Sequence, residues 1–223
     1  MADVTEQILT EAPSFDLMTL AEAKLLLGIN PADTTQDALV SMLISTYSAY
    51  ISTKCDRRFG RERVAETWRD VFNGRLALRH WPVKAADVET VVAAGSAVSE
   101  GSAVQALGWE IDERSGKLSY VAPNDATCSA WPQSVIVTYT GGFNLPSDSS
   151  MELMPLKQAC AILIMEYKMR LVTAQVAGIR QISHREARVT YFDPNAVLLR
   201  MAGKSPSMQA VDALLINYMR LWA

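Results

Sequence analysis

Residue types on which many enzymes and metal sites depend are scarce in this sequence. Its 223 residues include 2 His and 3 Cys, and the chain contains no P-loop, dinucleotide-binding glycine motif, HExxH motif or calcium loop. The cysteines are widely spaced and form no CxxC pair, so we expect reduced and mostly buried thiols rather than a disulfide or a zinc site. The sequence predicts no cofactor and no bound metal ion.

Long apolar runs and an excess of one charge are also missing. The longest uninterrupted apolar run, Ala159 to Met165, is far too short to span a membrane. Acidic residues precede the first basic residue, Lys24, which is not the pattern of a secretory signal. We therefore expect a soluble protein made in the cytoplasm, with no membrane partner. With 21 basic and 24 acidic residues, the chain also lacks the basic excess of a protein that reads nucleic-acid sequence.

The two histidines are the main candidates for acid–base chemistry. His80 precedes Trp81 and Pro82, and because a proline indicates a strand edge or a turn, we expect His80 to be a partly exposed turn residue. His184 lies between Ser183 and Arg185, but neighbours in sequence do not face one another productively, so no catalytic triad is predicted. We expect no catalytic residues and no enzymatic activity.

Three helices are predicted around a β-rich region. The first, over 19–28, begins with a capping box in which Thr19 and Glu22 satisfy each other's backbone amides. The second, over 35–58, repeats apolar residues at helical spacing. The third, over 153–173, is apolar around so much of its circumference that we expect it to pack on more than one side, in the centre of a bundle or against a neighbouring subunit.

Between the second and third helices, residues 61–143 have the pattern of short strands. Stretches rich in Val, Thr, Trp and Tyr alternate with Gly, Ser, Asn and Pro, which predicts a small antiparallel β unit. Residues 94–106 are expected to form a long, exposed hairpin loop. Four tryptophans are expected in the core of this unit: Trp68, Trp81, Trp109 and Trp131.

These expectations amount to an α+β fold: a helical bundle with an inserted small antiparallel β lobe and a C-terminal extended and helical arm. The division of the chain is an N-terminal tail over 1–17, a core over 18–172 and a docking arm over 173–223. The tail is polar, acidic and interrupted by Pro13, so we expect it to be mobile or to dock on a partner.

The densest group of charges lies between Lys54 and Arg63. Basic residues in the last turn of a helix oppose the negative end of its dipole, which is one interpretation. The other is a contact with an acidic partner surface or with DNA phosphate. The candidate partner-binding residues here are Arg57, Arg58 and Arg61.

The C-terminal arm contains the other candidate partner-binding residues. A polar, basic stretch is followed by an amphipathic helix, and a helix this short needs a surface for its apolar face. That surface is either the chain's own bundle or a partner protein, where aromatic side chains commonly contribute much of the binding energy. The candidates are Arg180, Arg185, Arg188, Leu214, Tyr218 and Trp222.

The order of several short motifs resembles the bacteriophage head–tail connector family, also called adaptor or head-completion proteins. The resemblance covers about residues 18 to 172, and its specificity comes from the order and spacing of the motifs. They are Met18–Lys24 with Leu27-Gly28-Ile29, Asp37–Ile51 with Arg57-Arg58-Phe59, Leu78–Val83, Val135–Phe143, and Met154–Ala159.

The resemblance implies a structural virion protein in the phage neck, between capsid and tail. It implies a self-associated, twelve-fold ring that binds the portal protein ring and a stopper or tail-completion protein. Double-stranded DNA would pass non-specifically through the lumen, which a slightly negative chain suits because it adds little friction with phosphate. Two alternatives stay open: another neck or tail protein, such as a stopper or tail terminator, and a DNA-binding accessory protein or small enzyme.

Overall fold

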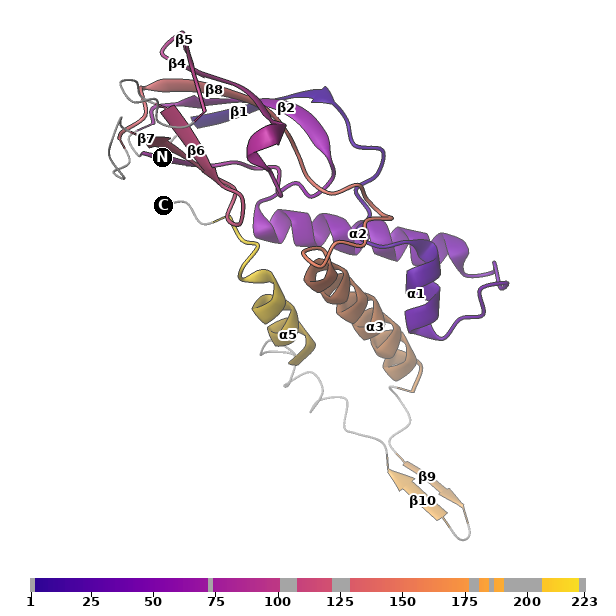
Figure 1. Ribbon diagram of the computed structural model, residues 1–223. Helices are drawn as coiled ribbons and strands as arrows, with labels where there is room; N and C mark the ends of the chain where they lie inside the picture. The colour runs from indigo at the N-terminus through magenta and orange to yellow at the C-terminus, as the bar shows by residue number, and fades with distance from the viewer. Residues whose placement is uncertain are drawn as a thin grey trace.

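A β sandwich stacked on a group of helices makes up the protein (Figure 1). The computed structural model describes residues 3–71, 74–100, 108–121, 129–176, 181–184, 187–190 and 206–220. Within these ranges the chain forms four α-helices and antiparallel sheets, so the fold is α+β as predicted. Among the described residues, no helix combines the length and the apolar composition that a membrane crossing requires.

The first helix starts and ends where local sequence signals predict. The Thr19 hydroxyl accepts a hydrogen bond from the Glu22 amide (3.2 Å), and the Glu22 carboxylate accepts one from the Thr19 amide (2.6 Å). Gly28 ends the helix in the left-handed conformation, with φ of 66°. The helices are α1 (Leu20–Leu27), α2 (Asp37–Cys55), α3 (Met154–Val176) and α5 (Pro206–Leu215).

Two antiparallel sheets face each other across the apolar core of the sandwich. The larger has the order β1-β2-β8-β4-β5 and the smaller the order β3-β7-β6. The larger sheet consists of β1 (Asp3–Thr10), β2 (Glu62–Arg69), β8 (Ser134–Gly141), β4 (Val88–Ala93) and β5 (Ser96–Val98). The smaller consists of β3 (Arg75–Ala77), β7 (Lys117–Val121) and β6 (Gly108–Asp112), and a short 3-10 turn, η1 (Ala85–Asp87), precedes β4.

The N-terminal segment is a strand and not the predicted free tail. Strand β1 pairs antiparallel with β2, from Asp3 opposite Arg69 to Thr10 opposite Arg63. Further along, Leu17 is completely buried and its amide donates to the Ser48 hydroxyl (3.0 Å). The prediction for residues 1–17 was therefore wrong over the described part, because pairing with a strand more than fifty residues away decides its structure.

The apolar side chains form two cores, one inside the sandwich and one among the helices. Trp68, Trp109 and Trp131 belong to the sandwich core as predicted, whereas Trp81 belongs to the helical core. In Figure 1, α2 crosses α3 and α5 instead of running alongside them, so the predicted helical bundle with an inserted lobe is not confirmed.

The predicted hairpin loop is shorter than expected. Ala94 and Gly95, both with positive φ, form the turn between β4 and β5. Residues 96–98 therefore pair back on β4, and residues 94–100 are exposed as predicted, except for the half-buried Val98. Residues 101–107, the rest of the predicted loop, lie outside the described part of the chain.

The described C-terminal residues 206–220 pack on the chain's own body. Val211 and Leu215 of α5 are completely buried in the helical core, and Asp212 forms an ion pair with Lys54 at the end of α2. The Tyr218 ring lies edge-on to Trp81, with centroids 5.3 Å apart. The apolar face of α5 was expected to pack either on the chain's own bundle or on a partner protein, and the structure favours the chain's own helices. Residues 206–220 are therefore not part of a free docking arm.

A short hairpin lies between α3 and α5 in the sequence. It consists of β9 (Gln181–His184) and β10 (Ala187–Thr190). In Figure 1 it lies beyond the end of α3, away from the sandwich.

Candidate functional site

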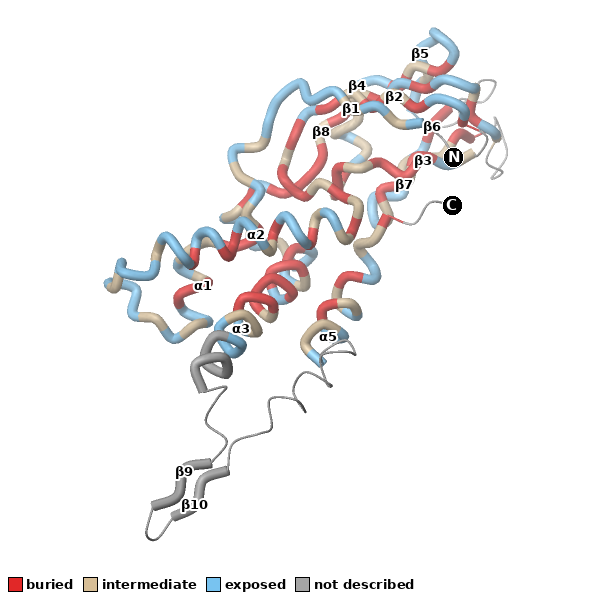
Figure 2. The backbone as a smooth tube through the Cα atoms, turned by 180° about the vertical axis from the view of Figure 1, so that it is seen from behind, coloured by how far each residue is buried: buried red, intermediate tan, exposed pale blue. Residues whose placement is uncertain are grey.

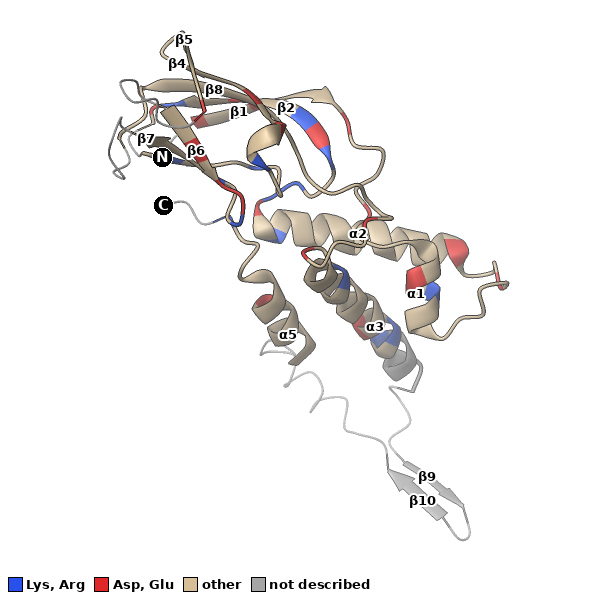
Figure 3. Ribbon diagram, in the orientation of Figure 1, with Lys and Arg blue, Asp and Glu red and all other residues tan. Residues whose placement is uncertain are grey.

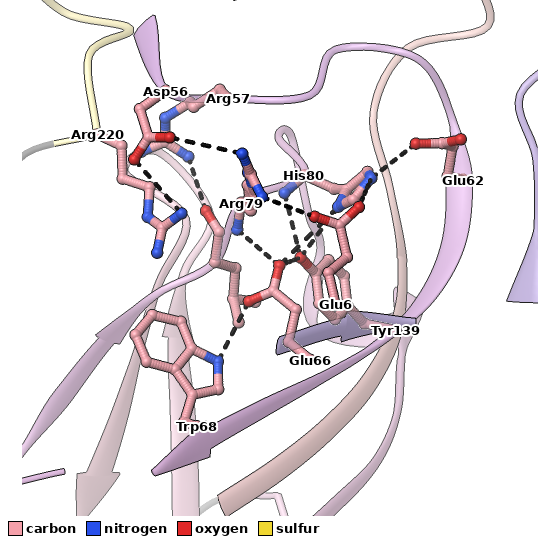
Figure 4. A network of polar contacts seen from close by, with 11 residues as sticks. Glu6, Asp56, Arg57, Glu62, Glu66, Trp68, Arg79, His80, Tyr139 and Arg220 are labelled. Carbon is pink, nitrogen blue, oxygen red and sulfur yellow. Dashed lines mark hydrogen bonds and ion pairs between the residues drawn. The ribbon is translucent and has the colours of Figure 1, made fainter. Parts of the chain in front are cut away.

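Polar side chains converge where the sandwich meets the helices (Figure 4). Side chains on a strand alternate between its two faces, and the inward face of β2 carries Glu62, Val64, Glu66 and Trp68. Two carboxylates are thus placed in the protein interior, with exposed fractions of 1% and 0%. We call the whole group the polar junction: Glu6, Asp56, Arg57, Glu62, Glu66, Arg79, His80, Tyr139 and Arg220.

Glu66 is the best-satisfied carboxylate of the polar junction. It accepts hydrogen bonds from the Tyr139 hydroxyl, the Arg79 amide (2.9 Å) and the Trp68 indole (3.2 Å). Burial raises the pKa of Glu66, but the nearby His80 ring, at 3.9 Å, and hydrogen bonds from Tyr139 and the Arg79 amide outweigh it and hold this pKa below its ordinary value. Burial and the Glu66 charge together raise the pKa of Tyr139 well above 10.0. Glu66 is therefore an anion and Tyr139 a neutral donor to it.

His80 is completely buried, so the prediction of a partly exposed turn residue was wrong. Its backbone amide donates to the Tyr139 hydroxyl (3.1 Å), which draws the segment after β3 beneath the sheet. On one side of the ring, Nε2 lies 2.8 Å from Glu62 Oε2 and 3.7 Å from Glu6 Oε1. On the other side, Nδ1 lies 3.5 Å from Tyr139 Oη.

A histidine beside glutamates could in principle move protons. A general base must reach the proton that it abstracts, and an imidazole with no exposed surface cannot touch a substrate from solution. The same three side chains, Glu6, Glu62 and His80, have ligand atoms within 4.8 Å of one another, close enough to hold a metal ion. The geometry thus favours binding or structural roles over acid–base catalysis.

Two arginines join the sandwich to the helices through the polar junction. Arg79 lies 3.1 Å from Glu6 on β1 and 3.8 Å from Asp56 at the end of α2. Arg220, beyond α5, lies 3.6 Å from Asp56 and stacks over Trp68 of β2, 5.4 Å from the ring centroid. These contacts hold the end of α2 and the C-terminal segment against the sheet.

The three basic residues predicted after the second helix do not form one surface. Arg57 is buried, and its guanidinium donates to the carbonyl oxygens of Leu78 (3.2 Å) and Ser115 (2.7 Å). Burial, together with the nearby Arg220 charge, lowers the pKa of Arg57 to about 10. Its side chain is therefore unavailable to a partner, which corrects that prediction.

The other two basic residues remain at or near the surface. Arg58 is half-buried, and Arg61 pairs with Asp87 (2.9 Å). Figure 3 shows the Lys and Arg residues of the described chain interspersed with Asp and Glu over both layers. Within the described part of the chain, this distribution shows no basic stripe of the kind that binds a phosphate backbone.

The candidate partner-binding residues of the C-terminal segment do not lie together on one surface either. Leu214 and Tyr218 pack against the helical core, and the Tyr218 hydroxyl donates to the Glu152 carbonyl (2.9 Å). Arg188 lies on β10. Arg180, Arg185 and Trp222 lie outside the described residues.

Three exposed methionines lie on one side of α3, together with the exposed polar residue Gln158. Met154, Met165 and Met169 are 55%, 46% and 65% exposed. Met165 lies about three turns after Met154, and Met169 about one turn after Met165, so all three are on the same side of the helix. The opposite side, with Leu156 and Leu163, is buried in the helical core. Figure 2 shows buried residues along most of the described part of α3. We call Met154, Met165 and Met169 the methionine face. Methionine adapts its shape to a partner, and exposed apolar patches commonly mark interfaces.

Comparison with known proteins yields matches among solved structures. No protein-family model matches the sequence, and no curated protein matches it. A chain from the neck of an empty GTA particle, computed with C6 symmetry, has a TM-score of 0.53 and 16% identity, over 98% of this chain and 97% of that one. A chain from the virion of a native gene transfer agent (GTA) particle has a TM-score of 0.50 and 18% identity, with the same coverage. The likeness is one of fold, and it extends over almost the whole of each chain.

Proposed function

We propose that the protein is a structural, non-enzymatic subunit of the neck of a phage-like particle, where it joins the portal vertex to the tail. The observation that carries this proposal is the fold that the chain shares, over 98% of its length, with a chain from a GTA neck. The sequence motifs over residues 18 to 172 support an adaptor in preference to a stopper or tail terminator. The fully buried imidazole of His80 supports a structural role.

In this proposal the subunits form a ring around the DNA. A closed ring requires that one surface of each copy contact a different surface of the next. The methionine face of α3 supplies one such surface, because its side chains are apolar and exposed in the single chain. A second group of exposed apolar residues lies along β1 and beyond it, at Ile8, Leu9 and Phe15. The twelve-fold symmetry implied by the sequence resemblance is part of the proposal.

The portal ring and a stopper or tail-completion protein are the proposed neighbours above and below the ring. The segment between α3 and α5 is the proposed contact, through Arg180, Arg185 and Arg188, with acidic residues of one neighbour. Hairpin β9–β10 lies away from the sandwich, where it can reach another protein (Figure 1). Leu214 and Tyr218 are left out of this contact, because they pack on the chain's own core.

The proposed passage of double-stranded DNA needs no tight binding. A net charge of −3 and the mixture of signs in Figure 3 keep attraction to phosphate weak. DNA could then slide through the lumen without sequence-specific contacts.

Sizing the purified chain alone and mixed with the portal protein from the same particle tests the proposal. We expect a complex with the portal, and rings in electron micrographs of that complex. A double variant, Met165→Lys with Met169→Lys, should prevent ring formation without lowering the melting temperature, because both side chains are exposed.

The matched control is Ile136→Lys, which changes a 40% exposed apolar residue on β8 and should leave the rings intact. A chain that remains monomeric and never binds the portal would contradict the proposed function. Rings that form equally well with the methionine variant would place the subunit interface elsewhere.

A further inference from the structure

We propose that Glu6, Glu62 and His80 bind one divalent transition-metal ion of the zinc class inside the polar junction. Their ligand atoms lie within 4.8 Å of one another. His80 Nε2 faces both carboxylates, at 2.8 Å from Glu62 and 3.7 Å from Glu6. An imidazole nitrogen with carboxylate oxygens is a ligand set that suits zinc and its neighbours in the first transition row.

The charges of the polar junction leave a place for a cation. The Glu62 and Glu66 carboxylates are buried and the Glu6 side chain is 11% exposed, whereas the Asp56 side chain is 41% exposed and is screened by solvent. A buried charge is costly unless it is paired. The carboxylates are those of Glu6, Asp56, Glu62 and Glu66, and the guanidinium groups are those of Arg57, Arg79 and Arg220.

Glu62 is the carboxylate in closest contact with the His80 ring. Its carboxylate is buried, and its contacts among the described residues are His80 Nε2 and a long hydrogen bond from the Ala12 amide, at 3.4 Å. The guanidinium groups lie toward Asp56, Glu66 and one oxygen of Glu6 instead. A cation between Glu62, Glu6 and His80 would neutralise the side of the polar junction that the arginines do not reach.

The hydrogen-bonding neighbours of these side chains resemble those that commonly orient metal ligands. The nitrogen of a ligating histidine that does not bind the metal is usually held by a hydrogen bond, and ligating carboxylates are held likewise. Here His80 Nδ1 faces Tyr139 Oη at 3.5 Å, and Tyr139 donates in turn to Glu66. The second oxygen of Glu6 accepts a hydrogen bond from Arg79 (3.1 Å). Metal binding requires the tautomer of His80 with its hydrogen on Nδ1, which these contacts accommodate.

The ion would join three parts of the chain that are far apart in sequence. Glu6 lies on β1, Glu62 on β2, and His80 in the segment after β3. Strand β1 is at the edge of the larger sheet and pairs with β2 alone. The bound ion would therefore hold the N-terminal strand in place, so its removal should loosen β1 before the rest of the sandwich.

Titration of the full chain with cobalt tests the site directly. The protein is stripped with EDTA, dialysed and titrated with Co²⁺, whose visible absorption bands report its ligation, and Zn²⁺ is then added as a competitor. We expect one Co²⁺ per chain, displacement by Zn²⁺, and a melting temperature that rises with Zn²⁺ concentration. Elemental analysis of the dialysed protein gives the stoichiometry independently.

Glu6→Gln is the diagnostic variant, because Glu6 is the most exposed of the three ligands and Gln can still accept the hydrogen bond from Arg79. It should weaken Co²⁺ binding by at least about tenfold. The control Glu89→Gln, at an exposed position on β4 of the same sheet, should bind as the wild type does. Circular dichroism establishes that both variants are folded.

If Glu6→Gln does not fold, hydrogen exchange of wild-type β1 with and without Zn²⁺ tests the site instead. Slower exchange of residues 3–10 with Zn²⁺ supports the site, and unchanged exchange contradicts it. A wild-type chain that binds no Co²⁺, or equal binding by both variants, also overturns the proposal. Ring assembly is not part of this test, so its result is independent of the proposed function.

Discussion

The α-carbon of Gly142 faces the carbonyl oxygen of Gly60 so closely that a Cβ atom on Gly142 would lie 2.1 Å from that oxygen. Gly142 also has φ of 108°, a conformation that residues with a side chain rarely adopt. Here the end of β8 crosses the segment between α2 and β2, and Phe143 forms a β-bridge with Gly60. This crossing connects the sandwich to the helices and requires a residue without a side chain.

Gly142→Ala should therefore destabilise the protein strongly, by more than about 3 kcal/mol, because backbone strain and a clash with backbone add together. Gly28→Ala is the control: Gly28 has φ of 66° but nothing within 4 Å of its added Cβ, so only the conformational cost of about 1 kcal/mol remains. Urea denaturation followed by circular dichroism gives both values. Similar losses for the two variants would show that the close approach to Gly60 is unimportant.

Leu163→Ala should lower the free energy of unfolding by about 2–5 kcal/mol, since the Leu163 side chain is buried in the helical core. Met169→Ala on the same helix should change it by less than about 0.5 kcal/mol, because Met169 is 65% exposed. Thermal and urea denaturation of the isolated chain measure the two effects. A large loss from Met169→Ala would mean that the methionine face is covered within the single chain.

Removal of the C-terminal segment should destabilise the body of the protein. If this segment bound only a partner protein, a chain ending at Thr173 would stay folded. The structure predicts the opposite for any truncation that removes residues 206–220, because Val211 and Leu215 are part of the helical core. A chain ending at residue 205 should melt at a clearly lower temperature, or without a cooperative transition.

Point variants within the same segment separate packing from chain length. Leu215→Ala should cost about 2–5 kcal/mol, whereas Ile216→Ala, at a neighbouring position that is 61% exposed, should be close to neutral. Differential scanning calorimetry of the two variants provides the comparison. Equal stability of the truncated and complete chains would mean that the segment is a separate arm after all.

The capping box of α1 should make stability depend on pH. Burial raises the pKa of Glu22, but hydrogen bonds from Lys157 and Thr19 outweigh it and hold this pKa below its ordinary value of 4.5. A carboxyl with a lowered pKa contributes stability above its unfolded pKa, and the contribution disappears as the pH falls through the folded pKa. Gln can keep the hydrogen bonds of the capping box but loses the charge beside Lys157, so Glu22→Gln should lower stability at pH 7 by at most about 1 kcal/mol.

The difference between Glu22→Gln and the wild type should shrink as the pH falls below the ordinary pKa of 4.5 and through the lower folded pKa. Urea denaturation at a series of pH values measures it, with Glu110→Gln on the exposed face of β6 as a control that should show no such pattern. A difference that stays constant down to acidic pH would show that charge at Glu22 does not contribute.

The buried thiols should react only when the protein unfolds. Burial raises the pKa of both the Cys55 thiol and the Cys160 thiol to about 12, so the reactive thiolate is rare at neutral pH. A Cys128→Ser variant should react very slowly with a thiol reagent such as Ellman's reagent when folded. In urea it should release the equivalent of both remaining thiols. Rapid labelling of the folded variant would contradict the packing around α2 and α3.

The sequence by itself determined the elements that depend on neighbouring residues. The capping box of Thr19 and Glu22, the left-handed Gly28 and the apolar stripe around Leu163 involve contacts within a few residues or one turn, so α1 and α3 were predicted close to their observed bounds. The short strands within 61–143 were predictable in kind for the same reason. Local sequence signals did not show whether any of the predicted partner-binding residues lies at the surface or in the interior.

Only the tertiary structure decided which segments meet. Strand β1 exists because Asp3–Thr10 finds the edge of β2, and nothing local in those residues distinguishes an edge strand from a polar tail. Arg57 was predicted to bind a partner, yet it is buried because the chain after α2 turns beneath the sandwich. Glu62 and His80 are separated in sequence, and their 2.8 Å contact depends on two cores packing against each other. Alternation along β2 predicts that Glu62 and Glu66 share a face, but which face turns inward is set by the whole sheet.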